Sequence, residues 1–182
     1  MGRIASGKST VAQQLASELG WPVFSSDELR KTLVGVPLTI RTAPELRDEV
    51  YSRRMTERTY EQLLETGLAA LATHSGVVLD ATFSSRAKRD VLREKCVKAD
   101  LRLQVIELEA NLEEIVKRLK AREESTAEIS DARLEDLEKL SAVYEPPTEF
   151  AEDFIKVSTR GSVSDAVRAV LLRLADKQST AG

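Results

Sequence analysis

The sequence has a single cysteine, Cys96, few aromatic residues and no long apolar run. A lone cysteine excludes an internal disulfide and is typical of cytoplasmic proteins. No run approaches the ~20 apolar residues of a membrane span, and Met1 leads into a glycine-rich stretch instead of a signal sequence. The net charge of −3 carries no general attraction to nucleic acid. We therefore expect a cytoplasmic globular protein with no membrane partner, and the charge argues mildly against a nucleic-acid partner.

The length of 182 residues suits one domain with a real core and is too short for two ordinary domains. Helical apolar stripes alternate with short apolar strands, which predicts an α/β fold with a mostly parallel sheet. No stretch resembles a linker, so a single domain is expected over residues 1–182. Strands are predicted at Pro22–Ser25, Gly76–Asp80, Leu103–Leu108 and Phe154–Val157, and the longest helices at 46–73, 85–97 and 162–174.

Residues 2–9 fit the phosphate-loop pattern G-x-x-x-x-G-K-[ST]. The glycines let the backbone curl so that its N–H groups point at phosphate oxygens, and the following helix adds its dipole. In such a loop Lys8 reaches the β- and γ-phosphates and Ser9 offers a hydroxyl to Mg²⁺. The sequence therefore predicts ATP and Mg²⁺ as ligands, with nucleotide-binding residues Gly2, Ala5, Ser6, Gly7, Lys8, Ser9 and Thr10.

Two carboxylates follow predicted strands. Asp80 ends the strand at 76–80, where a carboxylate can hold Mg²⁺ beside Ser9, and we predict it as a metal ligand. Asp27 comes just after the strand at 22–25, at the edge where ligands of open parallel sheets bind. By spacing alone, Asp27 is equally well a helix N-cap and a site residue.

Arg118 and Arg122 lie four residues apart on one predicted helix face. They lead into a stretch without apolar period, at about residues 122–131, which is typical of a lid that brings arginines onto a transferring phosphate. Two solvent-exposed arginines paired with glutamates of the same helix would give the same spacing. Both interpretations stay open.

These residues together resemble a known family. The chain resembles the P-loop (AAA-type) kinases that are often fused to aminoglycoside-phosphotransferase-like domains, and the Asp-x-x-Arg step at Asp27 is similar to that of zeta toxins and 5′-polynucleotide kinases. The resemblance covers nearly the whole chain in order. It is carried by Ala5–Thr10, Ser26–Asp27 with Arg30 and Lys31, Val78–Phe83 with Arg89, and Arg118 and Arg122 before Ser130–Ala132.

The resemblance implies roles for individual residues. Asp27 would be the base that takes the proton of the acceptor hydroxyl, and Arg30 would clamp the acceptor or a phosphate. Arg118 and Arg122 would be nucleotide and lid arginines, and Arg89 a further anion contact. The resemblance also implies an adenylate-kinase-like parallel sheet with helices on both faces, and a phosphotransferase-like domain as a fused or neighbouring partner.

One element of that fold is missing from the sequence, namely an apolar strand directly before the phosphate loop. The resemblance places this first strand in the middle of the sheet, between the strands at 77–80 and 103–108. Without it, backbone groups of both neighbours stay unpaired, at ~1–3 kcal/mol each. We therefore expect residues 1–182 alone to be poorly soluble, partly unfolded or in need of a partner strand, which leaves their activity open.

The sequence as a whole predicts a kinase. It would transfer the γ-phosphoryl group of Mg-ATP to a hydroxyl of a small-molecule acceptor, with Lys8, Asp27 and Arg122 as catalytic residues. Two alternatives stay open: a kinase of nucleic-acid 5′ ends, which a basic groove at residues 41–58 would favour, and a non-catalytic ATP-binding module that regulates a partner.

Overall fold

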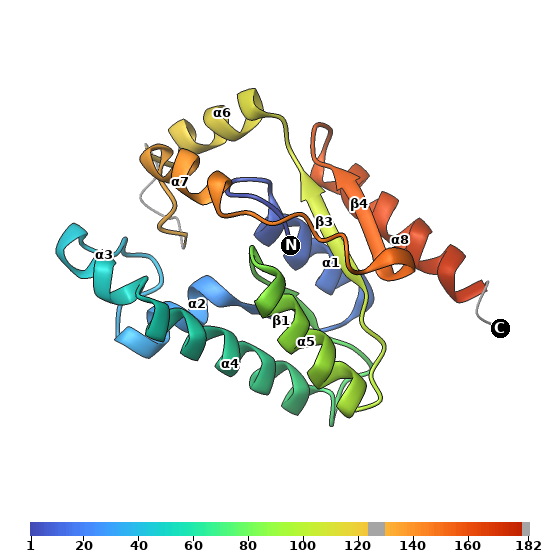
Figure 1. Cartoon of the computed structure of the whole chain (residues 1–182). Helices are drawn as coiled ribbons and strands as arrows, with labels where there is room; N and C mark the ends of the chain where they lie inside the picture. Colours follow the sequence, from blue (N-terminus) through green and yellow to red (C-terminus); the bar gives the residue numbers. More distant parts are fainter. Residues whose placement is uncertain (124–129, 180–182) are drawn as a thin grey trace.

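The computed structural model describes residues 1–123 and 130–179 (Figure 1). None of the described helices has both the length and the apolar character of a membrane span. In chain order the elements are α1 (Lys8–Leu19), β1 (Val23–Ser25), α2 (Ser26–Val34), α3 (Pro44–Val50), α4 (Arg53–Ala70), β2 (Val78–Asp80), α5 (Arg86–Lys98), β3 (Val105–Glu109), α6 (Leu112–Glu123), η1 (Leu134–Asp136), α7 (Leu137–Ala142), η2 (Ala151–Asp153), β4 (Phe154–Ser158) and α8 (Val163–Ser179).

All four predicted strands form, and they pair in parallel. Strand β1 pairs with β2, with Ser25 opposite Asp80. Strand β3 pairs with β4, with Val105 opposite Phe154. In the described part of the chain no ladder joins β2 to β3, so the predicted sheet is present as two two-stranded halves. The α/β class and the parallel direction are confirmed.

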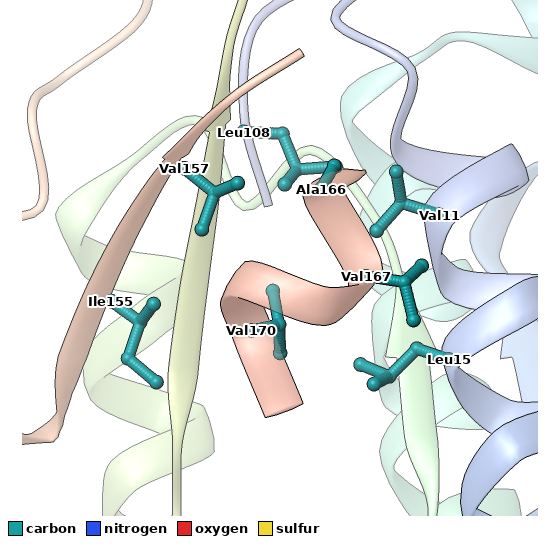
Figure 2. Packing of buried hydrophobic residues seen from close by; sticks show 8 residues of the cluster. All are labelled: Val11, Leu15, Leu108, Ile155, Val157, Ala166, Val167 and Val170. Carbon is teal, nitrogen blue, oxygen red and sulfur yellow. The ribbon is translucent and has the colours of Figure 1, made fainter. Parts of the chain in front are cut away.

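Helices cover both faces, as the resemblance implied. On one face α1 and α8 pack against β3 and β4 (Figures 1 and 2). On the other face α4 and α5 pack over β1 and β2, with Tyr60, Leu63 and Leu92 in the core. The core between α1, α8, β3 and β4 consists of Val11, Leu15, Leu108, Ile155, Val157, Ala166, Val167 and Val170.

A cavity of about 680 Å³ lies between the two half-sheets. Apolar side chains from α1, β2, β3 and α4 line it, among them Leu15, Leu79 and Ile106. Met1 also lines this cavity. Its amino group donates to the Ile106 carbonyl (2.6 Å), and its carbonyl accepts from the Leu108 N–H (2.9 Å). This is the bonding pattern of a parallel strand, and Met1 also packs in the cluster that contains Leu79 of β2, so it lies where the resemblance places the first strand.

The helix predicted over residues 46–73 is wrong as a single element. It is broken at Tyr51 and Ser52 into α3 and α4. The Ser52 hydroxyl accepts from the Met55 N–H (3.2 Å) and so caps α4. The end of α3 is held by Arg30, whose Nη1 donates to the Val50 carbonyl (2.9 Å). The break brings the α3–α4 junction against α2.

Candidate active site

The phosphate loop has the backbone that its glycines predicted. Gly7 is left-handed (φ 90°) and begins α1, which has no side-chain N-cap. Gly2 also has positive φ (141°), and a Cβ there would lie 2.5 Å from the Leu108 carbonyl oxygen. The Ser6 hydroxyl is fully buried and has no hydrogen-bond partner among the described residues. An uncapped helix start beside an unpaired buried hydroxyl fits an anion such as phosphate.

Two side chains from distant parts of the sequence hold this loop. Arg118 of α6 donates from Nη1 to the Ala5 carbonyl (3.3 Å) and from Nη2 to the Thr159 carbonyl (2.7 Å). The Thr159 hydroxyl donates to the Ser6 carbonyl (2.9 Å). Arg118 thus contacts the phosphate loop, and it also pairs with Glu114 of its own helix (2.9 Å), as the alternative interpretation expected. Thr159 was missed by sequence reasoning, although its place just after β4 at the carboxyl edge was a usable signal.

Lys8 lies at the start of α1, where its Nζ donates to the Arg3 carbonyl (2.8 Å). Burial lowers the pKa of Lys8, the charges of Asp80 and Asp27 oppose the shift, and Arg122 adds to it. The three charged groups predicted for the site are therefore its electrostatic neighbours. Ser9 and Thr10 are exposed on the first turn of α1. The negative charges of Asp80 and Asp27 do not fully offset the loss of hydration that burial imposes on Lys8. An anionic ligand is therefore favoured beside this lysine.

Asp27 lies in the first turn of α2 and is not the cap of that helix. The Ser25 hydroxyl accepts from the Asp27 N–H (3.3 Å), so Ser25 is the N-cap. Burial raises the pKa of Asp27, the nearby charge of Asp80 raises it further, and a side-chain hydrogen bond with Ser130 opposes the shift. The N-cap interpretation of Asp27 is therefore wrong, and its carboxylate is hydrogen-bonded to Ser130 beside Asp80 instead of capping α2.

The predicted metal ligands fit a Mg²⁺ that arrives with a nucleotide. Asp80 is buried at the end of β2 and interacts electrostatically with Lys8, the residue before Ser9. Residues 1–123 and 130–179 contain no cluster of three or more His, Cys, Asp or Glu side chains that would hold a metal alone. Mg²⁺ bound through one carboxylate, a hydroxyl, phosphate oxygens and water needs no such cluster.

Arg89 corrects a prediction. The resemblance made it an anion contact, but it is 1% exposed and forms a buried ion pair with Glu149. It also donates to the Phe83 and Glu145 carbonyls (2.9 Å each). Its guanidinium therefore ties α5 to residues 145–149, and its hydrogen bonds go to protein groups there instead of standing free for an anion.

Most of the predicted lid lies outside the described residues, which omit 124–129. At its start, Arg122 lies in the last turn of α6, and Arg41 donates to the Arg122 carbonyl. At its other end, Asp131 accepts from the Thr42 N–H (2.9 Å) and the Tyr51 hydroxyl (3.0 Å). Sequence reasoning missed this cluster around Asp131, because its members come from three separate segments.

Comparison with known proteins places the chain in a family. The family described as "AAA domain" matches residues 1–147, most of the chain. The chain belongs to this family. Among curated proteins, this AAA-domain protein is 31% identical over 122 residues to a shikimate kinase of Rhodopseudomonas palustris, covering 67% of the chain and 53% of that enzyme. The chain thus spans about half the length of that relative, and its match to Rv2004c of Mycobacterium tuberculosis spans 27% of that protein.

Solved kinase structures share the fold of this AAA-domain protein. A gluconokinase from Sinorhizobium meliloti matches with a TM-score of 0.63 at 22% identity, over 99% of this chain and 91% of that one. The APS kinase CysC of M. tuberculosis, in complex with AMPPNP and APS, matches with a TM-score of 0.65 at 17% identity, over 96% and 94%. The fold is therefore that of P-loop kinases.

Proposed function

We propose that this AAA-domain protein is an ATP-dependent small-molecule kinase. The observation that carries the proposal is a phosphate loop that begins a helix without a side-chain cap, and whose Lys8 interacts electrostatically with the carboxylates of Asp27 and Asp80. A nucleotide site needs the loop and Lys8, but a transfer site also needs a base. Asp27, freed from capping by Ser25, supplies that base. The curated relative and the solved structures that bear the name of a kinase support this choice.

Each residue has a part in the proposed transfer. The loop N–H groups and Lys8 bind the phosphates, and Ser9 and Asp80 would hold Mg²⁺, which supplies positive charge to the phosphate oxygens. The acceptor oxygen attacks the γ-phosphorus, the bond to the β–γ bridging oxygen breaks, and the hydroxyl proton passes to Asp27. Arg118 and Arg122 neutralise charge on the transferring group. The protein acts mainly by positioning and by charge, as is usual for this reaction.

The basic side chains from α2 to the start of α4 give little support to a nucleic-acid acceptor. Lys31 is 1% exposed, and its Nζ donates to the Leu38 and Ile40 carbonyls (3.0 and 2.8 Å). Arg47 pairs with Asp136 (2.6 Å), and Arg53 with Glu57 (2.7 Å). Because Lys31 and Arg47 are held by internal partners and the net charge is −3, we favour a small acceptor over a 5′ end.

Replacing Lys8 by alanine tests the phosphate loop. A charged hydrogen bond to phosphate contributes on the order of 2–3 kcal/mol, so Lys8→Ala should weaken binding of Mg-ATP by roughly 30- to 150-fold and abolish transfer. Isothermal titration with AMPPNP measures the affinity. Lys98→Ala on α5, whose side chain is 78% exposed, is the matched control. Equal affinity in the Lys8→Ala variant and the wild type would show that the loop does not bind phosphate.

The raised pKa of Asp27 predicts the acidic limb of the pH–rate profile. A base must be ionised to accept a proton, so kcat/KM should fall on acidification through a pKa above the usual value of about 3.9 for aspartate. The Asp27→Asn variant should lose this limb in its residual activity. A profile whose acidic limb is the same in both proteins would assign the titration to another group.

A further inference from the structure

Ser130 and Asp131 lie along one face of α2. They belong to the run Ser130–Ala132, to which the resemblance assigned no role. The Lys31 Nζ of α2 lies 3.6 Å from an Asp131 carboxylate oxygen, and both side chains are only 2% exposed. One turn earlier on the helix, Asp27 forms a side-chain hydrogen bond with Ser130. Residues four apart on a helix share a face, so two consecutive residues of one segment pair in order with Asp27 and Lys31.

Asp131 is a fixed point in this arrangement. Its carboxylate accepts from the Thr42 N–H (2.9 Å), from the Thr42 hydroxyl and from the Tyr51 hydroxyl (3.0 Å). Burial alone would raise the pKa of Asp131, but the bonds from Thr42, the charge of Lys31 and the Tyr51 hydroxyl lower it overall. The carboxylate therefore stays ionised, and groups of the protein use its acceptor positions. Asp131 acts as an anchor and not as a second base.

Lys31 completes the anchor from the side of α2. Its Nζ donates to the Leu38 and Ile40 carbonyls (3.0 and 2.8 Å) as well as facing Asp131. A buried ion pair loses hydration, and its own attraction does not reliably offset that loss. A buried polar network whose members all have partners does, however, specify one arrangement of the chain. The arrangement that it specifies here puts residue 130 beside Asp27.

The hydrogen bond with Ser130 acts directly on the proposed base. Burial raises the pKa of Asp27, and this hydrogen bond is the strongest of the influences that lower it. The side chains of Asp27 and Ser130 are both half-buried, so a ligand can still reach the carboxylate. A carboxylate has about four acceptor positions, and one serine hydroxyl uses one of them. The contact can therefore orient the carboxylate without blocking it.

We propose that Ser130 is a positioning residue for the proposed base. Its hydroxyl donates to one oxygen of Asp27 and fixes the plane of the carboxylate, which leaves the second oxygen for the hydroxyl of the acceptor. Correct orientation of a catalytic group supplies a large part of enzymatic rate enhancement. Ser130 acts through Asp27 and not on the nucleotide. The inference rests on the proposed kinase function, but the contact itself can be tested without turnover.

The kinetics of Ser130→Ala test this role. Loss of one hydrogen bond to a charged group should lower kcat roughly 10- to 100-fold, and the KM for ATP should stay unchanged. Ser130→Thr keeps the hydroxyl and should recover most of the lost kcat. Ser17→Ala, which changes an exposed serine of α1, is the matched control and should equal the wild type. An unchanged kcat in Ser130→Ala overturns the inference.

The same substitution in the Asp27→Asn background separates positioning from a merely structural role. The base is absent there, so adding Ser130→Ala should cause no further loss of the residual rate. Two residues that act through one another are non-additive in this way. An equal fractional loss in both backgrounds would show that Ser130 acts on some other group, and it would overturn the inference.

Carbon-13 NMR of the Asp27 carboxyl carbon detects the contact without turnover, and the Asp27→Asn variant assigns the resonance. Ser130→Ala should shift this resonance, Ser130→Thr should return it towards the wild-type position, and Ser17→Ala should leave it in place. A resonance that Ser130→Ala does not move overturns the inference, whether or not the protein proves to be a kinase. A shifted resonance in a protein that does not bind AMPPNP would instead contradict the kinase proposal and leave the contact standing.

Discussion

Replacing Asp27 by asparagine should lower phosphoryl transfer roughly 10²- to 10⁴-fold, the usual contribution of a general base. ATP affinity and the melting temperature should stay close to wild type. Asparagine keeps the shape of the side chain, and the cap of α2 is the Ser25 hydroxyl, which the substitution does not touch. The variant therefore removes the proton acceptor with little effect on the helix.

The matched control for this variant is Glu28→Gln, which removes a carboxylate from the same first turn of α2. Initial rates of transfer and AMPPNP titrations on both variants separate chemistry from binding. If turnover of Asp27→Asn equals that of the wild type, Asp27 is not the base. If Glu28→Gln loses as much activity as Asp27→Asn, the loss reflects the charge of the helix start and not proton transfer.

Adding an apolar strand before Met1 should raise the melting temperature by about 10 °C or more. For a chain of this size, 1 kcal/mol corresponds to roughly 2–4 °C. A designed extension of about five β-branched residues, the length of β3, would enter the 680 Å³ cavity between β2 and β3. Each buried apolar side chain contributes about 1.5–3 kcal/mol. The extension also replaces the Met1 amino group, whose pKa burial lowers to about 5, by an amide.

Calorimetry on matched extensions tests this prediction. The control carries the same residues with a central proline, which removes a ladder donor and is excluded from central strands. The apolar extension should raise the melting temperature and sharpen the transition, and the proline version should do neither. Equal melting temperatures for all three proteins would show that the cavity does not accept a strand.

Local patterns allowed the sequence to predict the elements and the phosphate loop. The strands ending at Ser25 and Asp80 are apolar runs between turn residues, and Gly2 and Gly7 occupy backbone positions with positive φ. Both signals depend on neighbours in the sequence, which is why they could be read without the structure. The start of α8 is local in the same sense, because Ser162 and Asp165 form a capping box with reciprocal bonds of 3.1 and 3.2 Å.

The features that the sequence did not predict depend on contacts between residues that are far apart in the chain or on the exact position of a side chain. Arg89 and Glu149 are sixty positions apart, and nothing in either local pattern identifies the other as its partner. The predicted long helix breaks at Ser52 although its apolar stripe continues. The Ser52 side chain caps the start of α4, and Arg30 of α2 binds the last carbonyl of α3. The ambiguity between cap and site at Asp27 was resolved only by the position of the Ser25 hydroxyl.

The central claim is that the protein transfers phosphate from ATP to a small hydroxylated molecule. The most direct measurement incubates the chain, and its strand-extended variant, with Mg²⁺ and ATP labelled in the γ-phosphoryl group in the presence of a panel of hydroxylated metabolites. Mass spectrometry then identifies the product that carries the label. The account predicts a phosphorylated small molecule in the wild type that Asp27→Asn forms at least a hundredfold more slowly. Tight ATP binding with no labelled product in either form would contradict it and favour a regulatory nucleotide-binding module, and label on nucleic-acid 5′ ends alone would contradict the choice of acceptor.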